Sequence, residues 1–215
     1  QYWVIGGGFG RLVAPVLASL PLDFSRQLLS HLGWALGCIV FYALVPMLFI
    51  RLVLREKLTT YGVSPKGYFG HLPIYLLLVS PILIALLVVS KQPEFQHTYP
   101  FYIPKNITEL VVWEIAYFLQ FVVLEFFFRG FLLHGFRKTL GSMAAITIMV
   151  LPYMMIHYPK PPLEAVGAVF AGVVLGALSL RSGNIWGGVA AHGLVAVSMD
   201  LLSLYHRGWF NSPPS

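Results

Sequence analysis

The sequence predicts an all-α membrane protein, a polytopic bundle of about six to seven transmembrane helices. Hydrophobic residues make up 58% of the 215 residues and charged residues only 10%. Soluble domains contain roughly 45–50% and about 25% of these two classes. The apolar residues also form runs close to the ~20 residues that a helix needs to cross about 30 Å of hydrocarbon.

Six apolar segments satisfy this length requirement: residues 32–50, 72–90, 110–136, 140–156, 165–180 and 185–205. The first two contain no charged residue, whereas the third includes Glu114, Glu125 and Arg129. Residues 2–22 are also apolar, but several glycines and Arg11 interrupt them. We therefore expect only a short or broken first span at this end of the chain.

Lysine and arginine concentrate in alternate loops, at residues 51–71, 129–139 and 181–183. The positive-inside rule places these loops in the cytoplasm. No internal repeat, low-complexity tract or long linker interrupts the pattern. We interpret residues 1–215 as a single integral membrane domain.

The net charge of +6 does not indicate nucleic-acid binding, because the charges stand in small groups between apolar runs. The single cysteine, Cys38, lies inside an apolar run and cannot form an intrachain disulfide. The histidines do not have the spacing of a helical zinc motif, and no pair of cysteines accompanies them. We expect no metal and no other cofactor.

Ionisable residues within apolar spans are the candidates for function, since a charge inside a bilayer costs several kcal/mol. Glu125 and Arg129 stand four residues apart, so they share one helix face. Tyr153 and His157 have the same spacing on the next span, and His192 lies about two turns into the last one. A buried ion pair that joins two helices would explain Glu125 and Arg129 alone. The two histidines favour a site in the bundle interior.

Small residues crowd the last two spans, and they let helix backbones approach closely. We expect them to draw both spans against the helix of Glu125. They are Gly167, Ala168, Ala171, Gly172, Gly176, Ala177, Gly187, Gly188, Ala190 and Ala191.

Over residues 110–200 the chain resembles the CAAX protease and bacteriocin-processing family, the Rce1-like glutamate intramembrane proteases. Three motifs carry the resemblance: Glu125-Phe-Phe-Phe-Arg129, Tyr153-Met-Met-Ile-His157, and Asn184-Ile-Trp leading to Ala191-His192. The resemblance implies that Glu125 and His157 activate a water molecule and that His192 stabilises the oxyanion. Arg129 and Tyr153 would support them, with Arg129 holding Glu125 ionised.

Two residues depart from the family pattern. Leu124 stands where the family has a first glutamate, and Ala196 stands where it has an asparagine. Either the protein is inactive or Glu125 alone serves as the base. Glu114 lies on the same helix face but ~16 Å away along the axis, too far to share one water. Asp200 cannot replace an oxyanion donor, because a carboxylate repels developing negative charge.

The sequence therefore predicts an intramembrane endopeptidase of a bacterial or archaeal cell membrane. Its partners would be the lipid bilayer and a membrane-embedded or lipid-proximal peptide or protein substrate. One alternative is a non-catalytic relative that binds a membrane peptide or a lipid-modified partner. Another is a proton-coupled transporter, which should contain inverted repeats that this sequence lacks. The oligomeric state stays open.

Overall fold

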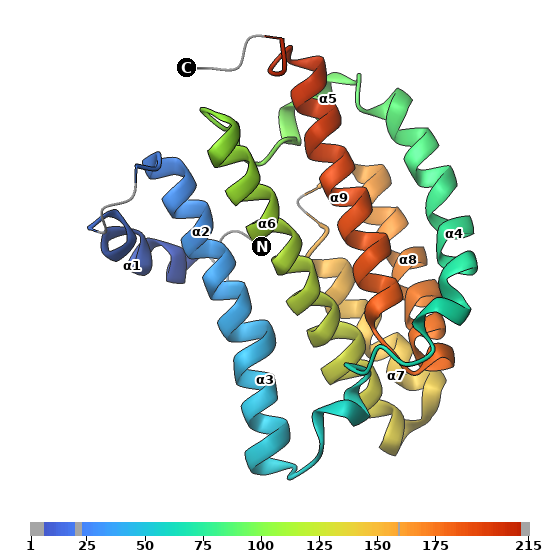
Figure 1. The fold of residues 1–215 in the computed structure, drawn as a ribbon. Coiled ribbons are helices and arrows are strands. Elements are labelled where there is room, and N and C mark those ends of the chain that lie inside the picture. The colour runs from blue at the N-terminus through green and yellow to red at the C-terminus, as the bar shows by residue number, and fades with distance from the viewer. Residues whose placement is uncertain (1–6, 20–22, 159, 212–215) are drawn as a thin grey trace.

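The computed structural model describes residues 7–19, 23–158 and 160–211, and all regular structure in these ranges is helical (Figure 1). This confirms the predicted all-α class. The α-helices are α1 (Gly7–Ala18), α2 (Arg26–Cys38), α3 (Val45–Leu48), α4 (Tyr68–Val89), α5 (Pro93–Thr98), α6 (Ile107–Glu125), α7 (Gly135–Met155), α8 (Pro162–Ser182) and α9 (Trp186–His206). Three π-helical segments, η2 (Ile39–Leu44), η3 (Phe49–Val53) and η5 (Phe126–His134), and one 3₁₀ turn, η4 (Leu58–Tyr61), join them.

Five helical stretches in the described residues are long and apolar enough to cross a membrane, which makes this an integral membrane protein. They are Arg26–Val53, Tyr68–Val89, Ile107–Met155, Pro162–Ser182 and Trp186–His206. The third has 49 residues, and at 1.5 Å per residue it would measure about 74 Å, more than twice the hydrocarbon thickness. The chain turns within it at Gly141, where φ is 79°. Met149 of α7 then packs back on Phe128 and Leu133 of η5. The third stretch thus corresponds to the two separate segments predicted from the sequence.

The predicted first span at residues 2–22 lies partly outside the described residues. Its described part contains α1, whose 12 residues extend about 18 Å, too short to cross the membrane. A Cβ atom placed on Gly10 would lie 3.1 Å from the backbone nitrogen of Trp34 in α2. The helix therefore packs directly against the backbone of α2.

Helix α6 is central in the bundle, with α2 on one side and α9 on the other (Figure 1). Aromatic side chains fill the space between α2 and α6. Trp113 of α6 is fully buried, stacks on Tyr117 with ring centroids 5.0 Å apart, and lies 6.4 Å from the ring of Trp34. This packing fixes α6, the helix that ends in Glu125.

The small residues of the last two spans have two different partners. On α9, a Cβ on Gly193 would lie 2.4 Å from the ring of Phe118 in α6, which confirms the expected close approach of α9 to the Glu125 helix. On α8, the corresponding contacts of Gly172 and Gly176 are with Tyr153 and Met149 of α7. Gly176 also meets Leu133 of η5, the continuation of the Glu125 helix, at 3.7 Å. The expectation for α8 therefore holds in part, with α7 as the main partner of its glycines.

Candidate active site

Glu125 is the last residue of α6, and Arg129 follows it in η5. Both side chains are completely buried, and Arg129 Nη1 lies 2.9 Å from Glu125 Oε1. No hydrogen bond forms to the guanidinium nitrogens of Arg129 within the described residues, so the contact is an ion pair. On the other side, the guanidinium carbon lies 4.1 Å from the ring centroid of Tyr153. The cation is thus held between a carboxylate and an aromatic face.

His192 of α9 is the imidazole that contacts Glu125. Its Nδ1 atom lies 3.2 Å from Glu125 Oε1, the same oxygen that faces Arg129. Because a carboxylate only accepts hydrogen bonds, Nδ1 carries a proton and donates the hydrogen bond, and in the neutral imidazole Nε2 of His192 is then an acceptor. The other carboxylate oxygen, Oε2, has no hydrogen-bond partner.

Gly188 makes room for the carboxylate on α9. It lies four residues before His192, and a Cβ added to it would lie 2.2 Å from Glu125 Oε2. Real Cβ atoms essentially never lie so close to another heavy atom, so a side chain at this position would require the carboxylate to shift. The contact between Glu125 and His192 therefore depends on a glycine one turn earlier on the same helix.

His157 lies two residues past the end of α7. Its Nδ1 atom is 2.9 Å from the carbonyl oxygen of Tyr153, which can only accept, so Nδ1 is protonated and Nε2 is again an acceptor. Burial, together with the charge of Lys160, lowers the pKa of His157 to about 3. The ring stacks on His192 with centroids 6.2 Å apart and planes at 21°. No direct contact joins His157 to Glu125 among the described residues.

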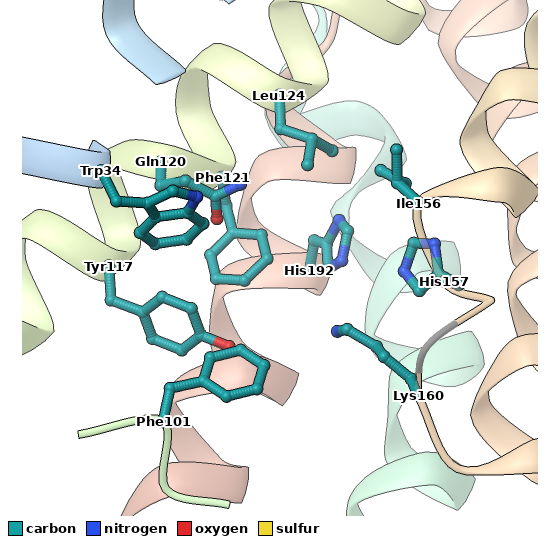
Figure 2. Close-up of a pocket in the computed structure, with 10 residues that line it drawn as sticks. All are labelled: Trp34, Phe101, Tyr117, Gln120, Phe121, Leu124, Ile156, His157, Lys160 and His192. Atoms are coloured by element: carbon teal, nitrogen blue, oxygen red, sulfur yellow. The ribbon is translucent and has the colours of Figure 1, made fainter. Parts of the chain in front are cut away.

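A narrow pocket opens beside the two imidazoles (Figure 2). A volume of about 20 Å³ in it is open to the centre of a water molecule, enough for water but not for a peptide. Glu125 does not line the pocket and reaches it through His192. The lining residues are Trp34, Phe101, Tyr117, Gln120, Phe121, Leu124, Ile156, His157, Lys160 and His192.

The turn between α8 and α9 sets the position of His192. Gly183 ends α8 with φ of 70°, and the side chain of Asn184, fully buried, then holds both neighbouring segments. Asn184 Nδ2 donates to the carbonyl of Lys66 (3.2 Å), and its Oδ1 accepts from the backbone N–H of Trp186 (3.1 Å). The loop before α4 thereby anchors the start of α9.

The residues predicted from the sequence fall into two groups. The first group is a chain of neighbouring side chains beside the pocket, and it consists of Glu125, Arg129, Tyr153, His157 and His192.

Glu114 and Asp200 lie elsewhere in the bundle. Asp200 accepts a hydrogen bond from the indole of Trp113 (2.9 Å), and neither oxygen of Glu114 has a partner. Of the two family departures, Leu124 lines the pocket, whereas Ala196 packs in the aromatic core.

Two polar residues of the pocket, Gln120 and Lys160, had not been predicted from the sequence. Gln120 stands among apolar residues of α6, and Lys160 belongs to a short loop rich in proline. Lys160 follows His157 by three residues, and this proximity is the only signal that could have indicated it.

The fold and this site define an integral membrane protein that carries polar groups suited to acid–base chemistry inside its helix bundle. Residues 106–198 match the family model described as type II CAAX prenyl endopeptidase, Rce1-like. The matched segment runs from the start of α6 into α9 and contains Glu125, Arg129, His157 and His192. The match confirms, over this segment, the resemblance found in the sequence: residues 106–198 are similar to Rce1-like endopeptidases. No curated protein and no solved structure matches the chain.

Proposed function

We propose that this protein is an intramembrane endopeptidase that hydrolyses a membrane-embedded or lipid-proximal peptide. The observation that carries the proposal is the contact between Glu125 Oε1 and His192 Nδ1 at a pocket large enough for water. A buried carboxylate that orients an imidazole, with the other ring nitrogen free to accept a proton, is a general-base arrangement. The Rce1-like family match supports the same reaction class.

In this mechanism a water molecule donates a hydrogen bond to Nε2 of His192. As the water oxygen attacks the scissile carbonyl carbon, Nε2 takes its proton, and Glu125 stabilises the imidazolium that forms. The tetrahedral intermediate then collapses, the C–N bond breaks, and the proton passes from His192 to the leaving amine. Arg129 faces the same carboxylate oxygen throughout and holds it in position beside His192.

His157 then has a different role from the one that the family resemblance implies. Its Nδ1–H is committed to the Tyr153 carbonyl, and no contact joins it to Glu125. The imidazole coupled to Glu125 is His192 instead. We propose that His157, through its Nε2 acceptor, orients the second proton of the same water.

A binding protein of the same family is the second candidate. Leu124 favours it, because this apolar side chain lines the pocket where the family has a carboxylate. Such a protein would retain Glu125, Arg129 and His192 only as a buried polar contact between helices.

The variant Glu125→Gln separates the two functions. It keeps size and polarity but removes the charge, so cleavage should fall by at least the ~10²-fold that general-base catalysis supplies. The matched control is Glu114→Gln, which alters another carboxylate of α6 outside the site. The probe is a quenched fluorescent peptide that ends in a prenylated cysteine and three further residues, the substrate type in the family's name, offered to the purified full chain in lipid nanodiscs. Equal cleavage by wild type and Glu125→Gln would refute the catalytic role of Glu125, and cleavage by neither would favour the binding protein.

A further inference from the structure

Peptide hydrolysis requires a hydrogen-bond donor for the negative charge that develops on the carbonyl oxygen. If the proposed function holds, neither imidazole of this pocket can supply it at the moment of attack. Nδ1–H of His192 donates to Glu125, and Nδ1–H of His157 donates to the Tyr153 carbonyl. Both Nε2 atoms are acceptors. The donor that the resemblance would add, an asparagine four residues after His192, is Ala196 here, and it packs in the aromatic core.

Lys160 carries the one cationic side chain among the pocket-lining residues that the structure describes. Its backbone N–H donates to the carbonyl of His157 (3.0 Å), which fixes the loop against the imidazole. Its amino group is directed into the pocket, on the side where His192 and His157 lie (Figure 2).

The amino group of Lys160 is held in this direction by three neighbours. Nζ donates to Glu164 Oε1 at 2.6 Å, and Glu164 Oε2 in turn accepts from the hydroxyl of Tyr99 at 2.7 Å. The ring centroids of Phe101 and Tyr99 lie 5.6 and 5.9 Å from Nζ, within reach of a cation–π interaction. An ammonium group has three N–H donors, so the bond to Glu164 leaves others for the pocket. The Lys160 side chain is only 16% exposed, which keeps its charge poorly screened.

We propose that Lys160 is a catalytic residue that donates a hydrogen bond to the oxyanion of the tetrahedral intermediate. This hydrogen bond adds no electrons or protons to the mechanism described above. The π electrons of the carbonyl move onto its oxygen as the water oxygen bonds to the carbon, and Lys160 stabilises that oxygen without losing its proton. When the C–N bond breaks, the electrons return to re-form the carbonyl. Lys160 thus occupies the role that the absent asparagine has in the family pattern.

The experiment compares Lys160→Met with wild type in both turnover and binding. Removal of one oxyanion donor should lower kcat by ~10²-fold or more and leave KM nearly unchanged, because the interaction forms only in the transition state. Lys160→Arg, which keeps a cationic donor, should recover part of the rate. Lys91→Met, a change at an exposed lysine outside the pocket, is the control.

Binding is measured with two ligands, and the ratio of their affinities is the phosphinate preference. The first is a labelled phosphinate analogue of the prenylated peptide, which carries a tetrahedral anionic centre. The second is the matched amide peptide, which is measured on Glu125→Gln protein so that it stays uncleaved. Wild type should prefer the phosphinate, and Lys160→Met should lose that preference by about tenfold or more, in line with transition-state binding. Lys160→Gln is the second variant if the methionine variant does not fold.

Three results would overturn the proposal: unchanged kcat, a rise in KM alone, which marks an anchor for a carboxylate of the substrate, or an equal phosphinate preference in wild type and variant. A failure of the proposed function shows up separately, as absence of cleavage by wild type, and a failure of the Glu125 mechanism as equal cleavage by wild type and Glu125→Gln. The phosphinate preference then still tests the role of Lys160. If wild type shows no preference for the phosphinate, the proposed role of Lys160 is overturned.

Discussion

Gly188→Ala tests whether the Glu125 carboxylate lies against α9. The added Cβ would lie 2.2 Å from Glu125 Oε2, more than 1 Å inside the 3.4 Å at which ordinary van der Waals contact begins. The carboxylate is fully buried and its other oxygen faces Arg129, so the added methyl group should displace it from this ion pair. Overpacking of this kind costs about 1–3 kcal/mol of stability. A displacement of about 1 Å in a catalytic group can cost ~10²-fold in rate.

The assay is cleavage of the prenylated peptide together with thermal unfolding in nanodiscs. Gly188→Ala should lower the melting temperature modestly and turnover by ~10²-fold. Gly167→Ala is the matched control, because its added Cβ meets nothing within 4 Å and alanine favours the helix by roughly 0.5–1 kcal/mol. It should unfold at the same temperature as wild type or higher. Full activity and an unchanged melting temperature in Gly188→Ala would refute the placement of Glu125.

Three further changes test the surroundings of this carboxylate. Arg129→Ala should cost about 3–5 kcal/mol of unfolding free energy, because it leaves Glu125 buried without its cation; an unchanged melting temperature would show that the pair is not buried. Leu124→Glu should lower both stability and turnover, since it adds a second buried carboxylate without a cation, whereas Leu124→Met should be tolerated; a rise in cleavage would mean that Leu124 marks a lost catalytic group. The lowered pKa of His157, caused by burial first and then by Lys160, means that the unfolded chain binds a proton that the folded chain does not. The contribution of the neutral His157 side chain to the free energy of unfolding is therefore complete above pH 6.5, and it is lost progressively as the pH falls toward 3. His157→Gln should weaken that pH dependence of the melting temperature, and an identical dependence in both proteins would contradict it.

Elements and local pairs were predictable from the sequence, because both follow from spacing along one helix. The run lengths gave the membrane spans, and the four-residue spacing gave the Glu125 and Arg129 ion pair. The approach of His192 to the same place followed from the cost of a polar group in lipid.

Contacts between distant segments were not predictable in the same way. Which histidine meets Glu125 depends on the end of α7 and on the anchored start of α9, neither of which has a periodic signal. Gly188 reads in the sequence as one of many small residues, and its function becomes visible only beside the carboxylate. The π-helical conformation of η5, which begins directly after Glu125, also cannot be predicted from hydrophobic periodicity.

The small volume of the pocket has a kinetic consequence. If the protein is the proposed endopeptidase, a pocket that admits water but no peptide would keep the base hydrated and would protect neighbouring membrane proteins from accidental hydrolysis. A substrate could then be cleaved only after the helices around the pocket separate, so the frequency of that opening would set an upper limit on turnover. Bilayer thickness and lipid order, which govern how easily helices separate, would then regulate the enzyme's speed without any contact with its catalytic groups.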